Sequence, residues 1–210
     1  MLGRPPSPLV TRESAGRMAL TIIDKDGLEA FTLPRLAAQM GVSTPALYHH
    51  FADRNELLTL VAHLVVGEAV RPPRPKRRKD WQQWVLDSSL NLREAVLRHR
   101  NAAPILLQFP PRVLVGKRYD EAAEVLAWAG VPKALLIQIL DGIETLAMGA
   151  TLTAAVRQQA LEPIFPGAEE GQLPSLAMAL EHNDCDELQL YSEAILSFLD
   201  GVMHRHEAAQ

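Results

Sequence analysis

The chain has 210 residues, 48% apolar and 22% charged, with a formal net charge of −4, a composition typical of a soluble globular protein that buries a core. No uninterrupted apolar run reaches the roughly 18 residues of a membrane span. Residues 1–14 hold no apolar stretch of signal-peptide length, so we expect a cytoplasmic protein. The single cysteine, Cys185, excludes an internal disulfide and a Cys-only zinc site, and we expect no metal and no cofactor. Leu and Ala favour helices, so we expect an all-α fold.

The charge is unevenly distributed along the chain. Residues 1–79 carry 12 Lys and Arg against seven Asp and Glu, whereas residues 80–210 carry nine against 18. A basic first third on an acidic body is typical of a nucleic-acid-binding end joined to a second function. Six of the 12 basic residues lie in the Pro-rich run from Arg71 to Lys79, which a solvated linker explains equally well. The sequence leaves the role of this run open.

The N-terminal part shows a flexible arm followed by helical patterns. Residues 1–10 include three prolines and are expected to form the arm. Helices are expected over 11–26, 32–40, 43–51 and 53 to about 70. The residues that mark their ends are Thr32, Ser43 and Asp53 as N-caps, with Glu56 completing a box-like start, and Gly27 and Gly41 as turn glycines. We take residues 11–58 as one domain, with its last helix running on to about 70.

The rest of the chain, residues 71–210, is expected to form a second helical domain. Helices are predicted over 80–96, 118–129, 133–161 and 188–206, with shorter helical pieces between the prolines of 101–116 and a loop over 163–174. Asp80 is a candidate N-cap and Pro132 a first-turn proline. The sequence shows no strand alternation and no internal repeat. The expected total is about nine or ten helices.

The segment Thr32–Phe51 has the pattern of a helix-turn-helix. Two helices that meet at a sharp angle need a small residue at their contact, which Ala37 supplies, and a turn residue free to take positive φ, which Gly41 supplies. The shared inner face is apolar: Leu36, Met40, Val42, Leu47 and Phe51. Ordinary corners between two helices show the same pattern, so the pattern favours DNA binding without requiring it.

The second helix of this segment has a surface suited to a DNA groove. At 100° per residue, Leu47 and Phe51 face the core, while Pro45 and His49 lie opposite. Small side chains with a few hydrogen-bonding groups let a helix lie flush in the major groove. The candidate DNA-binding residues are Thr32, Ser43, Thr44, Pro45, Ala46, Tyr48, His49 and Arg54. Of these, His49 suits a base edge, and Thr32 and Arg54 suit phosphates because they begin helices.

The stretch Gly27–Leu58 resembles the DNA-binding signature of the tetracycline-repressor (TetR) family throughout. The resemblance implies DNA contacts at the positions of Thr44 to Ala46, Tyr48 and His49, and a phosphate contact at Arg54. It also implies a homodimer with an effector-binding C-terminal domain. Pro34 departs from the pattern, since members often carry a polar or basic residue there.

The C-terminal domain is also similar to members of this family that bind a magnesium–tetracycline chelate. The similarity is carried by Trp81–Gln82, by residues 97–102, and by Gly130–Val131 with the long helix after them. The matching pocket positions hold Val70, Ser88, Leu92, Leu106, Phe109 and Thr153. The two metal ligands fall on Leu106 and Thr153, and leucine offers no ligand to a hard dication. We therefore expect an effector other than magnesium–tetracycline, bound in a more apolar pocket.

Two residue sets are expected to serve the effector and the dimer. Candidate pocket residues, each equally explained by core packing, are Trp84, Ser88, Leu92, Leu106, Phe109, Gln138, Asp141 and Met148. Asp141 and Glu144 are either polar anchors in the pocket or residues of a wet face. The long and the last helix carry apolar residues for a four-helix dimer interface, namely Leu135, Ile139, Leu146, Leu152, Tyr191, Ile195, Phe198 and Val202.

The sequence therefore predicts a homodimeric repressor that leaves a palindromic operator when a small, largely apolar effector binds. The helix that begins near Asn55 is expected to transmit the change. An enzyme is the main alternative, but no phosphate-binding loop, dinucleotide fingerprint or G-x-S-x-G motif is present. Two further alternatives remain: a dimeric adaptor that no longer binds DNA, and an activator.

Overall fold

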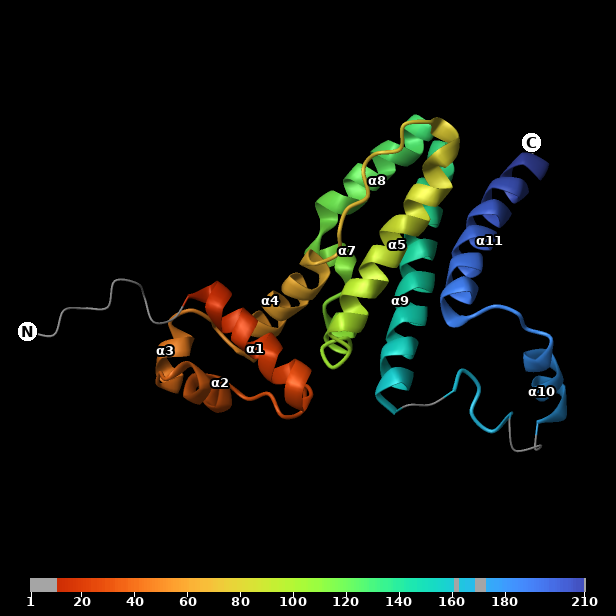
Figure 1. Cartoon of the computed structure of the whole chain (residues 1–210). Helices are drawn as coiled ribbons and strands as arrows, with labels where there is room; N and C mark the ends of the chain where they lie inside the picture. Colours follow the sequence, from red (N-terminus) through yellow and green to blue (C-terminus); the bar gives the residue numbers. More distant parts are fainter. Residues whose placement is uncertain (1–10, 161–162, 169–172, 210) are drawn as a thin grey trace, which may run out of the picture. The chain divides into compact units, whose positions relative to one another are not determined.

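The computed structural model describes residues 11–160, 163–168 and 173–209 (Figure 1). These residues contain no β-strand and form eleven α-helices with short 3₁₀ turns, so the all-α expectation is confirmed. The expected count of nine or ten helices is too low. The chain separates into two compact units: residues 11–69 with 95–116, and residues 70–94 with 117–209. The first unit thus includes 95–116, a segment that the sequence analysis grouped with the C-terminal domain.

The first unit is a small helical bundle. Its helices are α1 (Arg12–Asp26), α2 (Leu33–Met40), α3 (Thr44–Tyr48), α4 (Arg54–Gly67), α6 (Ile105–Gln108) and α7 (Pro111–Leu114), together with the last turn of α5. Helix α1 packs on α2 and α4, α2 packs on α3, and α4 also contacts α6 and α7. Gly16 permits the close contact of α1 and α4, since a Cβ there would lie 2.8 Å from a methyl carbon of Leu60.

The ends of these helices follow from local chemistry. Thr11 caps α1 in a capping box with Ser14, and the Thr32 hydroxyl accepts a hydrogen bond from the Arg35 amide at 3.3 Å. Gly41 adopts the left-handed conformation at φ 68°, as the turn requires. Three expectations need correction. Ser43 makes no side-chain cap, because its hydroxyl accepts no amide hydrogen bond; α3 ends at Tyr48; and α4 ends at Gly67, short of Val70.

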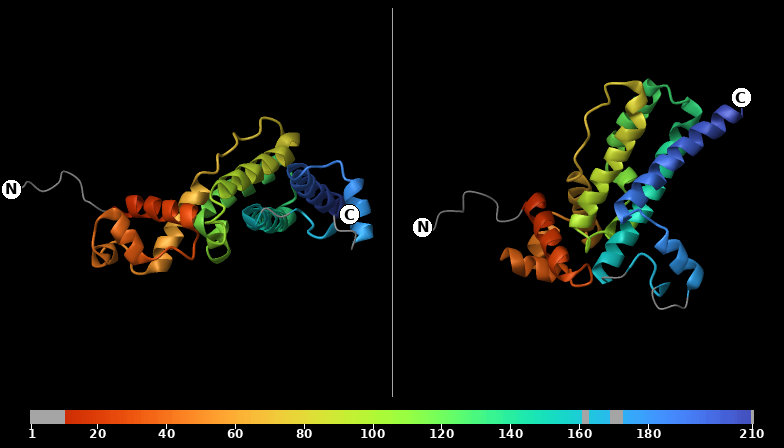
Figure 2. Two further views of the ribbon diagram at one scale, coloured as in Figure 1. Left: turned by 60° about the horizontal axis from the view of Figure 1, so that its bottom comes forward. Right: turned by 45° about the vertical axis from the view of Figure 1, so that its right-hand side comes forward.

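The second unit is built around a pair of long antiparallel helices. Its elements are η1 (Arg78–Asp80), most of α5 (Trp81–Arg98), α8 (Gly116–Ala129), η2 (Lys133–Leu135), α9 (Leu136–Ala160), α10 (Pro174–Glu181) and α11 (Glu187–Ala208). Helices α9 and α11 pack against each other, as the views in Figure 2 show. Gly142 permits this packing, because a Cβ there would lie 2.1 Å from the Phe198 ring. The core combines residues of α5, α8, α9 and α11.

Two local expectations for this unit need correction. Asp80 does not cap α5, because it lies inside η1 and its carboxylate binds Arg77 at 2.8 Å. Helix α10, over Pro174–Glu181, was not expected, since its short pattern follows a loop that is rich in Pro and Gly. Helix α11 begins at Glu187 after a capping box formed by Asp186 and Gln189.

One helix of the described ranges, Lys133–Ala160, is long and apolar enough by length and composition to cross a membrane. Its apolar residues do not form an uninterrupted run, because Asp141 and Glu144 lie among them. The core helix of a soluble protein meets the same criteria. Since this helix packs on α11 and contributes the buried Ile139 and Ala147 to the core cluster, we assign it to the core of the second unit.

Candidate DNA-binding surface and effector residues

The helix-turn-helix is formed by α2, the turn at Gly41 and α3. The Val42 amide donates to the Ala37 carbonyl at 3.0 Å, which closes the turn, and Ala37 is buried where the two helices meet. Leu47 is 1% and Phe51 2% exposed, and these two side chains fix α3 to the unit. This fixed face determines which side of α3 meets solvent.

The outer side of α3 is accessible within the first unit. Pro45 and His49 are exposed, Tyr48 is 55% exposed, and Thr44 and Ala46 are half-buried. Three further candidate residues lie at helix starts and are exposed: Thr32, Ser43 and Arg54. The eight candidate DNA-binding residues therefore all reach the surface, and those of α3 form one side of it.

Arg12 holds α3 in place, a role that the sequence analysis did not foresee. Its guanidinium forms an ion pair with Glu56 at 2.7 Å, donates to the carbonyl of His50, and lies 4.7 Å from the centre of the Phe51 ring. Hydrogen bonding from the Ala52 amide, and next from Arg12, lowers the pKa of Glu56. One side chain of α1 thus joins the end of α3 to the start of α4. No local pattern signals a contact across 38 positions.

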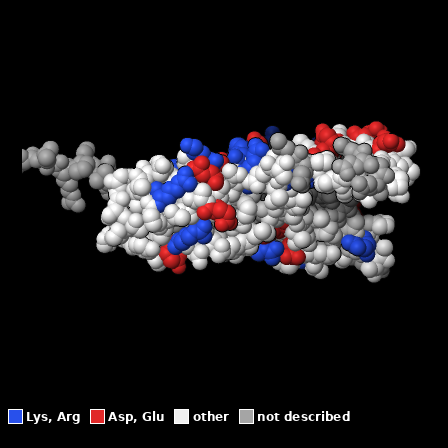
Figure 3. Space-filling model, turned by 90° about the horizontal axis from the view of Figure 1, so that it is seen from below, with Lys and Arg blue, Asp and Glu red and all other residues white. Residues whose placement is uncertain are grey.

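The helix-turn-helix unit is not itself basic. Residues 11–69 carry five Lys and Arg against seven Asp and Glu. Arg12, Arg17 and Arg35 each form an ion pair inside the unit. Arg54 stacks over the buried Phe31 ring at 5.5 Å while remaining exposed. Much of the face shown in Figure 3 is uncharged, and several Lys and Arg side chains lie beside Asp or Glu.

The basic run between Arg71 and Lys79 accounts for the positive charge of the first third, and it belongs to the second unit, where part of it packs on α8. Arg71 pairs with Glu121 of α8 at 2.8 Å, and Arg74 lies 5.4 Å from the centre of the Trp128 ring. These contacts distinguish the run from a linker that is solvated throughout.

His99 connects three segments of the first unit. Its Nδ1 lies 2.7 Å from an Asp24 oxygen near the end of α1, at hydrogen-bond distance. Its Nε2 lies 3.2 Å from a Glu68 oxygen just after α4; this second contact is an ion pair that lacks the geometry of a hydrogen bond. Hydrogen bonding to Asp24 raises the pKa of His99; burial opposes this, and Glu68 adds to it. Asn101 donates to the Asp24 carbonyl at 2.8 Å, and Arg98 pairs with Glu68 at 3.3 Å.

The candidate pocket residues are divided between the two units. Leu106 and Phe109 belong to the first unit and the other six to the second. Within the second unit, Met148 is buried, while Gln138 and Asp141 are exposed. The three on α5 are half-buried: Trp84, Ser88 and Leu92. Asp141 lies on the exposed face, as one of the two alternatives expected, whereas Glu144 is buried.

The two positions matched to metal ligands differ in environment. Leu106 is buried in the first unit, and Thr153 is exposed on α9, where its hydroxyl donates to the Gly149 carbonyl at 2.8 Å. Val70, another matched position, is exposed.

Most of the candidate dimer residues pack inside the chain. Five of the eight are buried in the core of the second unit, and Phe198 packs partly buried against it. The buried five are Leu135, Ile139, Tyr191, Ile195 and Val202. An apolar stripe predicts burial, but it does not say whether the covering surface belongs to the same chain. The apolar residues that α9 and α11 leave exposed are Ile137, Leu146, Val156, Leu188 and Leu190.

A short helix of small and hydrogen-bonding residues, fixed by two buried side chains behind a tight turn, defines a DNA-binding protein of the helix-turn-helix class. Residues 17–61 match the family described as bacterial regulatory proteins, tetR family. The tetracycline repressor protein class C of Escherichia coli is 29% identical over 169 residues, which cover 80% of this chain and 75% of that protein. The helix-turn-helix segment of this chain thus matches the tetR family of bacterial regulatory proteins over residues 17–61.

Two solved structures share the fold of this chain. ActR of Streptomyces coelicolor, in complex with actinorhodin, has a TM-score of 0.76 at 24% identity, over 94% of this chain and 98% of that one. BioQ with its double-stranded DNA operator has a TM-score of 0.61 at 21% identity, over 90% and 99% of the two chains. The likeness extends over both units.

Proposed function

We propose that this protein is a cytoplasmic, homodimeric transcriptional repressor that is released from a palindromic operator by a small effector. The observation that carries the proposal is the exposed side of α3, where Pro45 and His49 lie opposite the buried Leu47 and Tyr48 flanks them. The match of residues 17–61 to the tetR family supports DNA binding, and the operator complex of BioQ, which shares the fold, supports it further. His49 would contact a base edge, and Thr44, Tyr48 and Arg54 would contact phosphates.

The dimer is proposed to form through α9 and α11 in a four-helix arrangement. The exposed apolar residues Ile137, Val156 and Leu188 provide the surface, in place of the buried residues named from the sequence. A two-fold dimer reads half-sites that are separated by one or more turns of DNA, each roughly 34–36 Å.

The effector is proposed to bind in the C-terminal region and to favour one of two conformations of the dimer. A ligand shifts such an equilibrium only by its difference in affinity for the two states, typically about 1–3 kcal/mol of coupling. Related proteins have been solved with actinorhodin, and others are named tetracycline repressors. Because Leu106 offers no metal ligand, we propose that magnesium–tetracycline is not the effector here.

A gel-shift assay with the intergenic DNA beside the protein's own gene tests the function. We expect the wild-type dimer to bind this DNA, and His49→Ala or Tyr48→Ala to weaken binding at least tenfold, because each removes a contact from α3. His63→Ala is the control, since His63 is exposed on α4 and is not among the candidate DNA-binding residues. Equal binding by all four proteins, or binding by none, contradicts the proposal.

A further inference from the structure

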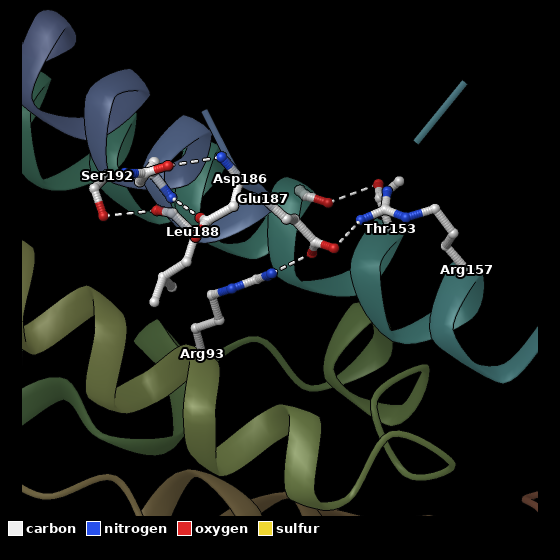
Figure 4. Close-up of polar contacts among 9 residues, drawn as sticks. Arg93, Thr153, Arg157, Asp186, Glu187, Leu188 and Ser192 are labelled. Atoms are coloured by element: carbon white, nitrogen blue, oxygen red, sulfur yellow. Dashed lines mark hydrogen bonds and ion pairs between the residues drawn. The ribbon is translucent and has the colours of Figure 1, made fainter. Parts of the chain in front are cut away.

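Three charged side chains from three helices meet in the second unit (Figure 4). Arg93 of α5 donates from Nη2 to one carboxylate oxygen of Glu187, the first residue of α11. Arg157 of α9 lies 2.6 Å from the other carboxylate oxygen. Burial opposes ionisation of Glu187, but hydrogen bonds from Arg157 and Arg93 outweigh it and lower the pKa of its carboxyl. One carboxylate therefore serves two guanidinium groups.

The Arg93 side chain is held inside the unit. It is 6% exposed, and its guanidinium lies 5.0 Å from the centre of the Tyr191 ring. The Tyr191 hydroxyl in turn donates to the Ser89 carbonyl at 3.2 Å, and burial raises the pKa of Tyr191 to about 12. Tyr191 is thus a neutral platform that orients the cation.

One end of the Arg93 guanidinium lacks an acceptor. Its Nη1 is buried and has no hydrogen-bond partner among the described residues. A buried charged donor without an acceptor is strongly unfavourable, and one carboxylate shared by two guanidiniums leaves an excess of positive charge.

The polar groups drawn nearby form hydrogen bonds with other partners. The Asp186 carboxylate accepts from the Gln189 amide at 2.8 Å, and the Ser192 and Thr153 hydroxyls donate to carbonyls of their own helices at 2.8 Å (Figure 4). None of these groups accepts a hydrogen bond from Arg93 Nη1, which has no partner among the described residues.

We propose that Arg93 Nη1 binds the carboxylate or sulfonate group of an effector whose remaining body is apolar. This inference rests on the proposed function, in which a small effector binds the C-terminal region of the repressor. Arg93 follows Leu92, a candidate pocket residue on the same helix. Tyr191 orients Arg93, and the effector's anion supplies the missing negative charge. A purely neutral effector would leave Nη1 without its acceptor.

Fluorescence titration of the full-length dimer with two probes tests the inference at constant ionic strength. The probes are 8-anilinonaphthalene-1-sulfonate and its uncharged analogue N-phenyl-1-naphthylamine, which share the aromatic body. We expect Arg93→Gln to weaken binding of the sulfonate about tenfold and to change binding of the neutral probe less than twofold. Arg157→Gln is the control, because it removes the same charge from the other side of Glu187 and is expected to have a smaller effect.

A second variant provides the test if circular dichroism shows that Arg93→Gln is unfolded. Glu187→Gln removes the carboxylate that competes for Arg93, so the sulfonate is expected to bind several-fold more tightly and the neutral probe equally. The inference is overturned when both probes respond alike to each variant, or when Arg157→Gln matches Arg93→Gln. A gel shift on the same wild-type protein separates the two claims: loss of operator binding refutes the repressor, whereas the probes report on the anion site alone.

Discussion

At the scale of single residues, the contacts that organise the first unit are made by side chains far apart in the sequence. Arg12 reaches His50 and Glu56, and His99 reaches Asp24 and Glu68. Neither role follows from a helical wheel, because a wheel describes only neighbours within one helix. The positions of these residues give each contact a distinct consequence for DNA binding or for stability.

Arg12→Gln is expected to weaken operator binding several-fold without removing any group proposed to touch DNA. The substitution takes away the ion pair and the cation–π contact that hold the end of α3, so the recognition helix loses its fixed orientation. Gel shift measures the loss. Arg17→Gln is the matched control, because Arg17 pairs only with Glu13 on the exposed side of α1. Equal losses of operator binding in the two variants would contradict the prediction, because they would show that binding depends on the positive charge of α1 and not on the contacts of Arg12.

His99 is expected to make stability fall as the pH rises. Its pKa is raised above 6.5 in the folded protein, mainly by Asp24, so its stabilising contribution is complete below pH 6.5. The contribution is lost as the pH rises through the higher folded-state pKa. Urea unfolding at several pH values above 6.5 should show that the free energy of unfolding of the wild type falls as the pH rises, and that it falls less steeply in His99→Gln. An identical pH dependence in both proteins would contradict this assignment.

At the scale of elements, the pairing of α9 and α11 depends on a single missing side chain. A Cβ at Gly142 would meet the Phe198 ring at 2.1 Å, whereas a Cβ at Gly149 would meet nothing within 4 Å. Gly142→Ala is therefore expected to destabilise the protein by about 1–3 kcal/mol through overpacking. Gly149→Ala, in the same helix, should be neutral or stabilising by up to about 1 kcal/mol.

Urea unfolding at one fixed protein concentration measures both glycine variants, since dimerisation adds to the apparent stability. Two variants of equal stability would mean that Phe198 turns aside without cost and that the helices do not depend on this contact.

At the scale of the whole molecule, the distribution of charge predicts a shallow salt dependence of DNA binding. Arg54 is the one cation of residues 11–69 proposed for a phosphate, and Arg4, which lies outside the described residues, adds at most one more per subunit. Two to four neutralised phosphates per dimer give a slope of log K against log salt of about −2 to −4. Gel shifts at several salt concentrations measure this slope.

The double variant Lys76→Gln/Lys79→Gln tests whether the basic run contributes. We expect an unchanged slope, because other residues of this run pair with α8 in the second unit. A wild-type slope much steeper than −4 that becomes shallower in the double variant would place the run on DNA instead.

The sequence by itself determined the helix-turn-helix and most helix boundaries, because these depend on residues within about four positions of one another. Thr32 caps α2, Gly41 turns the chain, and Leu47 with Phe51 fix the face of α3. Only the tertiary structure decided which apolar faces are covered by the chain itself, as with Ile139 and Ile195, and which stay exposed. It also placed residues 95–116 with the first unit and brought Arg93 to Glu187, because such contacts depend on how distant helices pack.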